Sequence, residues 1–393
     1  MTNLKSYYWI VFLFVFVKCT NEKSYPLYTL NILVDDLKST EIRHQKVPMQ
    51  LLYTVDNAEV LLQKGTIERR GGSSIIYPKY SYEIDLEQDV PLAELPVDDD
   101  WILNANYIDR SFLRHVFSYE LFRKMRRENI ASQCQYVELE LNGTYRGLYV
   151  LMEKMDKSTF KINKADPEAV IFKEPKLFYE SYKGLEKYMK GNAHQQIFPK
   201  YPSVNRTPLI DSIRTLVLES SDSVFTKDIV EVFDLESIID WHLLLLLSNN
   251  SDGILKNFFL YKVDKTTPLR IAIWDCDHGW GRDGDSELNL DRPLNLNRSI
   301  LFRRLLTFDW YKKALKKRWN ALNHSGLFSP QQLQKSIASK GRMIKDMATK
   351  NATLWSVSSS FYHDDSSFEQ EIAIMMKYVA MRHQVLSDYF STF

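Results

Sequence analysis

Two groups of polar residues in the middle of the chain have the types and the spacing that phosphate chemistry needs. Asp252 and Asn257 lie five residues apart, and the acidic pair Asp275 and Asp277 follows after two strand-like segments. In phosphoryl transfer from ATP, one Asp accepts the proton of the acceptor hydroxyl, an Asn five residues later holds a metal ion, and a later Asp holds metal against the phosphates. The order fits, with Asp252 as the catalytic aspartate.

Asn257, Asp275 and Asp277 are the predicted metal ligands, for Mg²⁺ or Mn²⁺. Asp275 and Asp277 are two residues apart at a strand end, so their side chains tend to the same face and either share a cation or place one carboxylate on it. Asp275 is favoured as the main ligand because it directly follows the apolar strand. The alternative is that these acids cap turns, and an isolated Asp-x4-Asn pair is more often a loop cap.

Composition indicates a large folded protein without a polyelectrolyte partner. The chain has 393 residues, of which 45% are hydrophobic and 13% aromatic, enough to bury a sizeable core. Lys and Arg number 51 against 50 acidic residues, a formal net charge of +1. Overall charge therefore argues against nucleic acid as a partner.

The amino terminus is typical of an exported protein. Lys5 precedes an apolar run over residues 7–17 that is too short to span a bilayer, and a polar stretch follows it. Residues 1–19 are therefore a predicted signal peptide. Cys19 stands where a bacterial lipoprotein carries its lipidated cysteine, although Lys18 departs from the small residue usual before it. We expect a secreted or cell-surface protein, with membrane contact only through a lipid anchor at Cys19.

Hydrophobic periodicity predicts a first part built of strands and a second part built of helices. Alternating and β-branched segments predict strands at residues 28–34, 46–55, 58–69, 78–86, 135–141, 145–153, 258–263 and 270–274. Helical spacing predicts helices at residues 109–125, 209–218, 235–247, 300–322, 330–348 and 368–389. Asp109 is a plausible cap for the first helix. Asn142-Gly143 predicts a tight hairpin turn.

This order of elements favours an α+β, two-lobed protein-kinase-like fold. Residues 28–160 would form an antiparallel-sheet N-lobe carrying one helix, and residues 161–393 a mainly helical C-lobe with an insertion around 177–232. Nucleotide would bind between the lobes, with the helix at 235–247 delivering Asp252 and the hairpin at 258–274 carrying Asp275. The same order also occurs in unrelated α+β proteins.

Six ordered segments resemble the spore coat protein H (CotH) kinase family, whose members are exported or surface-associated proteins with a divergent kinase-like fold. The matching segments cover the chain from about Asn31 to about Leu305. They are Arg70-Gly-Gly-Ser-Ser74, Pro78-Lys79 with the strand to Leu86, Trp101-Ile-Leu-Asn104 with Asp109 to Arg114, Leu141-Asn-Gly-Thr-Tyr-Arg-Gly-Leu-Tyr149 with Glu153, Asp252 to Asn257, and Trp274-Asp-Cys-Asp277. Gly72 departs from the family's usual Asn, and residues 276–281 from its usual aromatic and Thr.

The resemblance implies a phosphate-facing turn formed by Arg70, Ser73 and Ser74, in which small residues allow backbone N–H groups near anionic oxygen. It also implies that Lys79 contacts phosphate and that Glu153 contacts the adenine or ribose. Taken without the family, residues 71–74 are merely a flexible turn, Lys79 a solvated charge, and Glu153 an exposed strand-end carboxylate.

The function implied is an exported phosphotransferase that uses ATP and a divalent metal to phosphorylate hydroxyl side chains, Ser or Thr, of extracellular or surface proteins. One alternative is a catalytically inactive kinase-like adhesin or assembly scaffold, against which Asp252, Asn257 and Asp275 argue. The other is a kinase for a glycan or a small molecule, because the acids do not reveal the acceptor.

Overall fold

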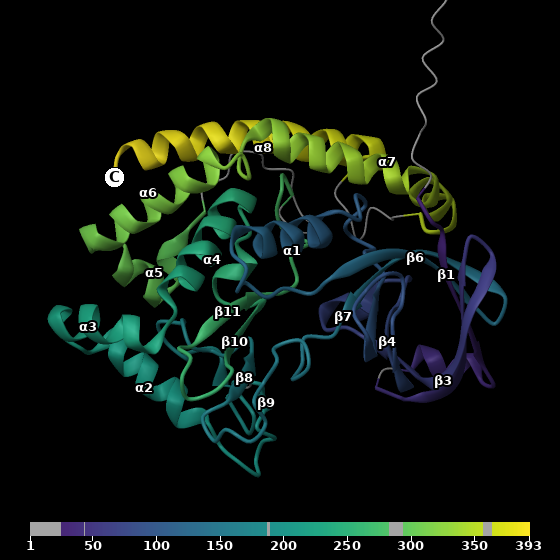
Figure 1. The fold of residues 1–393 in the computed structure, drawn as a ribbon, viewed down its shortest axis with the longest axis horizontal. Coiled ribbons are helices and arrows are strands. Elements are labelled where there is room, and N and C mark those ends of the chain that lie inside the picture. Colours follow the sequence, from purple (N-terminus) through teal and green to yellow (C-terminus); the bar gives the residue numbers. More distant parts are fainter. Residues whose placement is uncertain (1–24, 43, 187–188, 283–293, 357–363) are drawn as a thin grey trace, which may run out of the picture.

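A closed seven-stranded β-barrel forms the first part of the computed structural model, which describes residues 25–42, 44–186, 189–282, 294–356 and 364–393 (Figure 1). The predicted signal peptide and Cys19 lie outside these residues. In chain order the strands are β1 (Tyr28–Val34), β2 (Val47–Val55), β3 (Ala58–Arg70), β4 (Ser81–Val90), β5 (Asp98–Asn104), β6 (Cys134–Leu141) and β7 (Thr144–Glu153). Their spatial order is β1-β2-β3-β4-β5-β7-β6.

The expected two-lobed protein-kinase-like fold, α+β with an antiparallel-sheet N-lobe, is wrong. β1 pairs antiparallel with β2 on one side and parallel with β6 on the other, through partners from Thr29↔Glu138 to Ile32↔Leu141. This parallel pairing closes the sheet and leaves no free edge. The part expected to be mainly helical also contains a second, four-stranded sheet.

The barrel strands follow the alternation of their sequences. In β1 and β2 the apolar side chains that point inward are buried while their neighbours are more exposed. Leu30, Ile32, Leu51, Ile84 and Leu139 are among the residues that fill the interior. The predicted hairpin at Asn142-Gly143 is confirmed: both residues have positive φ, 48° and 71°, as a tight type I′ turn between β6 and β7 requires.

The helix α1 (Arg114–Met125) and the second sheet lie beside the barrel, and α7 and α8 pass over α1 to reach it (Figure 1). α1 begins five residues later than its predicted cap, because the Asp109 carboxylate accepts from the backbone N–H groups of Ser111 and Arg114 in a preceding turn. The second sheet has the order β11-β10-β8-β9. Its strands are β8 (Val170–Lys173), β9 (Gln196–Phe198), β10 (Phe258–Lys262) and β11 (Arg270–Ile273).

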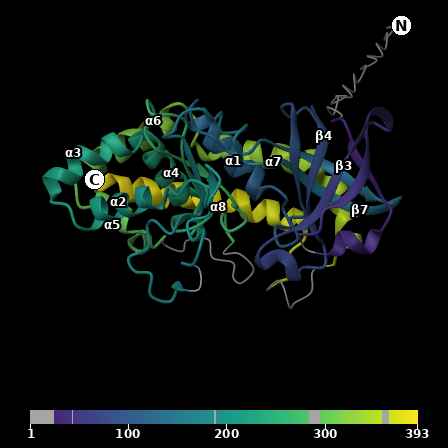
Figure 2. The same ribbon diagram turned by 90° about the horizontal axis from the view of Figure 1, so that it is seen from below.

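Seven further helices complete the described part of the chain. They are α2 (Thr207–Leu218), α3 (Asp222–Val232), α4 (Leu235–Ser248), α5 (Ile300–Leu305), α6 (Asp309–His324), α7 (Pro330–Leu354) and α8 (Phe368–Ser391). The helix predicted over residues 300–322 is two helices, since α5 ends at Leu305 and α6 starts anew at Asp309. Figure 1 and Figure 2 show α7 and α8 side by side, running from the helical part to the barrel.

Two hydrophobic cores result from this arrangement. One fills the barrel, and the other joins the outward-facing barrel residues Ile102, Val150 and Met152 to α1, the second sheet and the helices. β5 and β7 therefore contribute to both cores. The site residues are held where the second core meets the barrel wall.

Candidate active site

Asn257 and Asp275 are brought together by the hairpin of β10 and β11. Phe258 pairs with Ile273, so the residue before β10 and the residues after β11 lie beside each other. The Asn257 side-chain amide donates to the Asp275 carbonyl at 3.1 Å, and Trp274 N donates to the Asn257 carbonyl at 2.9 Å. Both Asn257 and Asp275 have positive φ, 61° and 50°, a conformation that Asn and Asp tolerate better than other residues.

Asp252 reaches the same place from the end of α4. This helix ends at Ser248 and is capped by Asn249, which has a left-handed φ of 57°, and a short turn from Asp252 to Ile254 follows. Asp252 Oδ2 lies 2.7 Å from Lys256 Nζ and 3.9 Å from His278 Nδ1. The other nitrogen of His278 lies 3.9 Å from Asp277 Oδ1. The two acidic segments of the sequence therefore meet on either side of one imidazole.

A third element, α1, adds His115 to the acids. His115 Nε2 lies 3.1 Å from Asp275 Oδ1, and one ligand atom from each of His115, Asp275 and Asp277 falls within 4.8 Å of the others. The imidazole is only 5% exposed, whereas the Asp275 side chain is 48% exposed. The three groups thus form one fixed nitrogen donor and two carboxylates, a donor set that suits a divalent cation.

Burial and the charges in this cluster shift the pKa values of the two carboxylates in opposite directions. Desolvation opposes ionisation of Asp275, but the hydrogen bond and charge of His115, with the nearby His278 and Lys173, outweigh it and lower the pKa of Asp275. Desolvation and the negative charge of Asp275 raise the pKa of Asp277 to about 6. Asp275 is therefore the carboxylate that stays ionised over the wider pH range.

The segment that carries both acids is held at several points. Asp275 N donates to Tyr119 Oη at 2.9 Å, and the Tyr119 ring stacks on the Trp274 ring. Further along, Trp280 N donates to the Ser248 carbonyl at the end of α4. The Arg114 guanidinium donates to the Gly279 carbonyl at 3.0 Å. Both α1 and α4 thus fix the position of residues 275–282.

Of the residues predicted to contact nucleotide, Arg70 lies at this site. Its guanidinium is 5.9 Å from the centre of the Trp274 ring and 3.8 Å from Glu83. Ser73 opens a short helical turn that includes Ser74, whose side chain is exposed. Gly71 has φ +133°, and a Cβ there would lie 2.7 Å from Ser74 Oγ, so this turn favours a residue without a side chain.

Lys79 and Glu153 are buried and hydrogen-bonded elsewhere. The Lys79 ammonium donates to the carbonyls of Ala105, at 2.9 Å, and Leu148, and burial lowers its pKa well below the ordinary value. The Glu153 carboxylate accepts from Gln133 N at 2.7 Å, and burial raises its pKa. Neither side chain is joined to the acids of the site by a contact within the described ranges.

Two side chains at the site had no spacing signal in the sequence. His115 stands in a helix next to Arg114, and its part in the cluster depends on α1 packing against residues 275–282. Lys173 ends the apolar strand β8, with its ammonium 5.5 Å from the centre of the Trp274 ring. The first three residues of that strand are Val-Ile-Phe, and this short apolar run inside a lysine-rich stretch is the local sequence feature that indicates a strand there.

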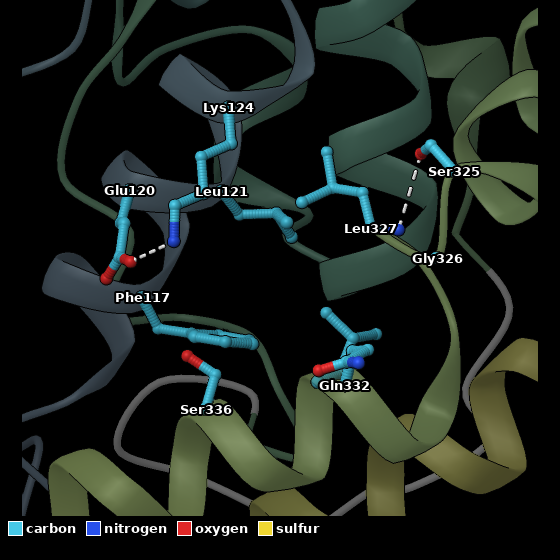
Figure 3. Close-up of a pocket in the computed structure, with 10 residues that line it drawn as sticks. Phe117, Glu120, Leu121, Lys124, Ser325, Gly326, Leu327, Gln332 and Ser336 are labelled. Carbon is cyan, nitrogen blue, oxygen red and sulfur yellow. Dashed lines mark hydrogen bonds and ion pairs between the residues drawn. The ribbon is translucent and has the colours of Figure 1, made fainter.

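A separate pocket of about 310 Å³ lies on the opposite face of α1 (Figure 3). Phe117, Glu120, Leu121 and Lys124 line it from α1, and the turn between α6 and α7 lines the other side together with the start of α7 (Figure 3). At 100° per residue these positions face away from His115 and Tyr119. The pocket therefore does not form part of the acidic site, although one helix serves both.

Comparison with known proteins agrees with the motifs. Residues 67–386 match the family model described as CotH kinase protein. The chain is 20% identical over 376 residues to the inner spore coat protein H of Bacillus subtilis (strain 168), an alignment that covers 94% of this chain and 99% of the relative. Among the described residues, no helix is both long enough and apolar enough to cross a membrane.

Proposed function

The chain belongs to the CotH kinase protein family, and from that premise we propose that it is an ATP-dependent phosphotransferase that phosphorylates Ser or Thr hydroxyls of proteins. The observation that carries the proposal is the meeting of Asp252 with Asp275 and Asp277 around His278. We also propose that its substrates lie at a coat or cell surface, because the Bacillus subtilis relative is named as an inner spore coat protein and residues 1–19 read as an export signal.

Asp252 is the group suited to accept the hydroxyl proton. Its Oδ2 is paired with Lys256 at 2.7 Å, which orients the carboxylate, and Oδ1 is the oxygen that would accept the substrate O–H. As the hydroxyl oxygen forms its bond to the γ-phosphorus, the bond from that phosphorus to the β–γ bridging oxygen breaks and ADP leaves. The hydroxyl proton passes to Asp252 late in this step.

His115, Asp275 and Asp277 would hold Mg²⁺ or Mn²⁺, together with Asn257, whose side-chain amide donates to the Asp275 carbonyl. The fit rests on the donor atoms, since two carboxylates and a buried imidazole nitrogen converge within 4.8 Å. The imidazole suits Mn²⁺ better than Mg²⁺, which prefers oxygen. When bound, the metal would neutralise charge on the nucleotide phosphates.

The proposal is tested by replacing Asp252 with Asn in the purified chain and measuring transfer from γ-labelled ATP in the presence of Mg²⁺ or Mn²⁺. Loss of a general base typically costs about 10²- to 10⁴-fold, so we expect transfer to fall by at least about 10²-fold while nucleotide binding persists. Asp264→Asn is the matched control, because Asp264 only caps an exposed turn at Thr266.

The outcomes separate the alternatives. Equal transfer by wild type and Asp252→Asn would show that Asp252 is not the base. A wild-type chain that binds no nucleotide and labels neither itself, an added protein nor a sugar would be a scaffold rather than an enzyme. Label that reaches an added glycan or small molecule but no protein would establish a different acceptor class.

A further inference from the structure

Two cations, Arg70 from β3 and Lys173 from β8, converge on the aromatic ring that precedes Asp275. The Arg70 guanidinium carbon lies 5.9 Å and the Lys173 ammonium 5.5 Å from the centre of the Trp274 ring. These residues come from different sheets and lie about a hundred positions apart in sequence. Their convergence is therefore a product of the fold and not of one basic stretch.

The register of the second sheet explains the position of Lys173. Lys173 pairs with Phe259, and Phe259 pairs with Ala272, so these three side chains share a face of the sheet. Trp274 follows Ala272 by two residues, and its ring contacts Phe259 edge to face. Lys173 thus lies at the end of the sheet where Asp275 begins. Lys262 lies at the opposite end, paired with Val170.

The two positive charges are incompletely neutralised. Within the described part of the chain, no ion pair joins Lys173 to a carboxylate. Arg70 has Glu83 at 3.8 Å, but Glu83 is also 2.7 Å from Lys154 and so serves two cations. Burial, followed by repulsion from Arg70, lowers the pKa of Lys173. Placing the positive charges of Arg70 and Lys173 near each other costs free energy, and a bound anion would offset that cost.

We propose that Arg70 and Lys173 form a subsite for a polyphosphate chain, with Lys173, in place of Lys79, as the phosphate-contacting lysine. The inference rests on the proposed function for the identity of the ligand as a nucleoside triphosphate. A guanidinium and an ammonium beside a divalent-metal site match the spread negative charge of linked phosphates. The subsite recognises the chain of linked phosphates that ATP and inorganic polyphosphate have in common.

The test is the affinity of the full chain for inorganic tripolyphosphate, ATP and adenosine with Mg²⁺, measured by calorimetry. A charge-assisted hydrogen bond contributes about 1.5–3 kcal/mol, so Lys173→Met should weaken tripolyphosphate and ATP binding by about tenfold or more. Adenosine binding should not change, because adenosine has no phosphate. Lys173→Arg should keep most of the affinity. Lys262→Met, which removes a lysine paired with Glu168 in the same sheet, should bind like wild type.

Failure of the subsite and failure of phosphotransfer give different results. If Lys173→Met binds tripolyphosphate and ATP as tightly as wild type, the subsite is overturned even where wild type transfers phosphate. If wild type binds tripolyphosphate through Lys173 but neither binds ATP nor transfers its phosphate, the subsite stands and the phosphotransferase proposal falls. Should Lys173→Met not fold, Arg70→Met makes the same test from the other strand, with the same tenfold loss expected.

Discussion

Lys79 and Lys173 show how burial decides which of two lysines is available to a ligand. Lys79 is 2% exposed, and its ammonium donates two hydrogen bonds, one to the carbonyl of Ala105 just after β5 and one to the carbonyl of Leu148 in β7. Lys173 is partly exposed and lies beside the acidic cluster. The sequence places Lys79 in a motif that resembles a phosphate-binding segment, yet the fold gives that ammonium a structural partner set.

Replacing Lys79 with Met should therefore affect stability rather than phosphate binding. Two buried carbonyls would lose their donor, at about 1–3 kcal/mol each, partly offset by removal of a buried amine. We expect the free energy of unfolding to fall by about 2 kcal/mol in denaturant titrations, with tripolyphosphate affinity within twofold of wild type. Lys173→Met should show the reverse pattern. A tenfold loss of phosphate affinity in a stable Lys79→Met protein would contradict this assignment.

The acids of the site could be predicted from the sequence, whereas their partners could not. Asp252, Asn257 and Asp275 stand in local patterns whose spacing implies convergence, and the structure brings all three to one place. His115 and Lys173 reach the site only through the packing of α1 and the register of β8. Such long-range contacts leave no periodicity or spacing in the chain. Local pattern thus predicted which polar residues converge but missed the histidine and the lysine that lie beside them.

At the scale of elements, α8 reaches back to the segment that carries the acids. Glu371, in the first turns of α8, is fully buried and pairs with Arg114 at 2.8 Å and with Arg282. Arg114 in turn holds the Gly279 carbonyl, and Arg282 also pairs with Asp364 at 2.8 Å. One carboxylate from the far end of the chain thus anchors both α1 and residues 279–282.

Replacing the Glu371 carboxylate with an uncharged amide should lower the stability of the protein and weaken metal binding. Glu371→Gln would leave two buried guanidinium groups short of one counter-charge, a loss that typically costs about 3 kcal/mol. We expect the free energy of unfolding to fall by about that amount and Mn²⁺ affinity to fall with it, measured by denaturation and by metal titration. Glu369→Gln, an exposed neighbour 3.7 Å from Lys345, should change stability by less than about 0.5 kcal/mol. Equal effects of the two substitutions would refute a special role for Glu371.

Elements with strong local patterns were predicted well, and their assembly was not. β1 spans the same residues as the predicted strand, and the hairpin of β6 and β7 forms at Asn142-Gly143. The closure of the barrel depends on the parallel pairing of β1 with β6, about a hundred residues away in sequence. Alternation specifies that a strand has a buried face but not which strand lies beside it. The antiparallel lobe expected from element order was wrong for this reason.

At the scale of the whole molecule, α7 fastens the helical part to the barrel. Near its end, Asn351 Oδ1 accepts from Leu148 N of β7 at 3.2 Å, and Trp355 Nε1 donates to the Arg146 carbonyl at 2.8 Å. Gly147 lies between these two contacts with φ +98°. A Cβ on Gly147 would come 2.3 Å from Asn351 Oδ1, so the close approach of α7 depends on the absence of a side chain there.

Gly147→Ala should accordingly destabilise the protein more than a glycine substitution that only strains the backbone. Gly143→Ala is the matched control, because Gly143 also has positive φ, +71°, in the same hairpin but has nothing within 4 Å of an added Cβ. We expect a loss of about 1 kcal/mol in unfolding free energy for Gly143→Ala, from the left-handed conformation alone. For Gly147→Ala we expect about 3 kcal/mol, because the overlap with Asn351 adds to that strain.

A double-mutant cycle with Asn351→Ala isolates the contact between the two parts of the molecule. Removing the Asn351 side chain takes away the atom that an added Cβ would strike, so Gly147→Ala should cost less in that background. We expect a coupling free energy of about 1–2 kcal/mol, whereas Gly143→Ala with Asn351→Ala should be additive within about 0.5 kcal/mol. Additive behaviour at Gly147 as well would mean that α7 does not press on the barrel at this point, and that the two cores are joined chiefly through β5 and β7.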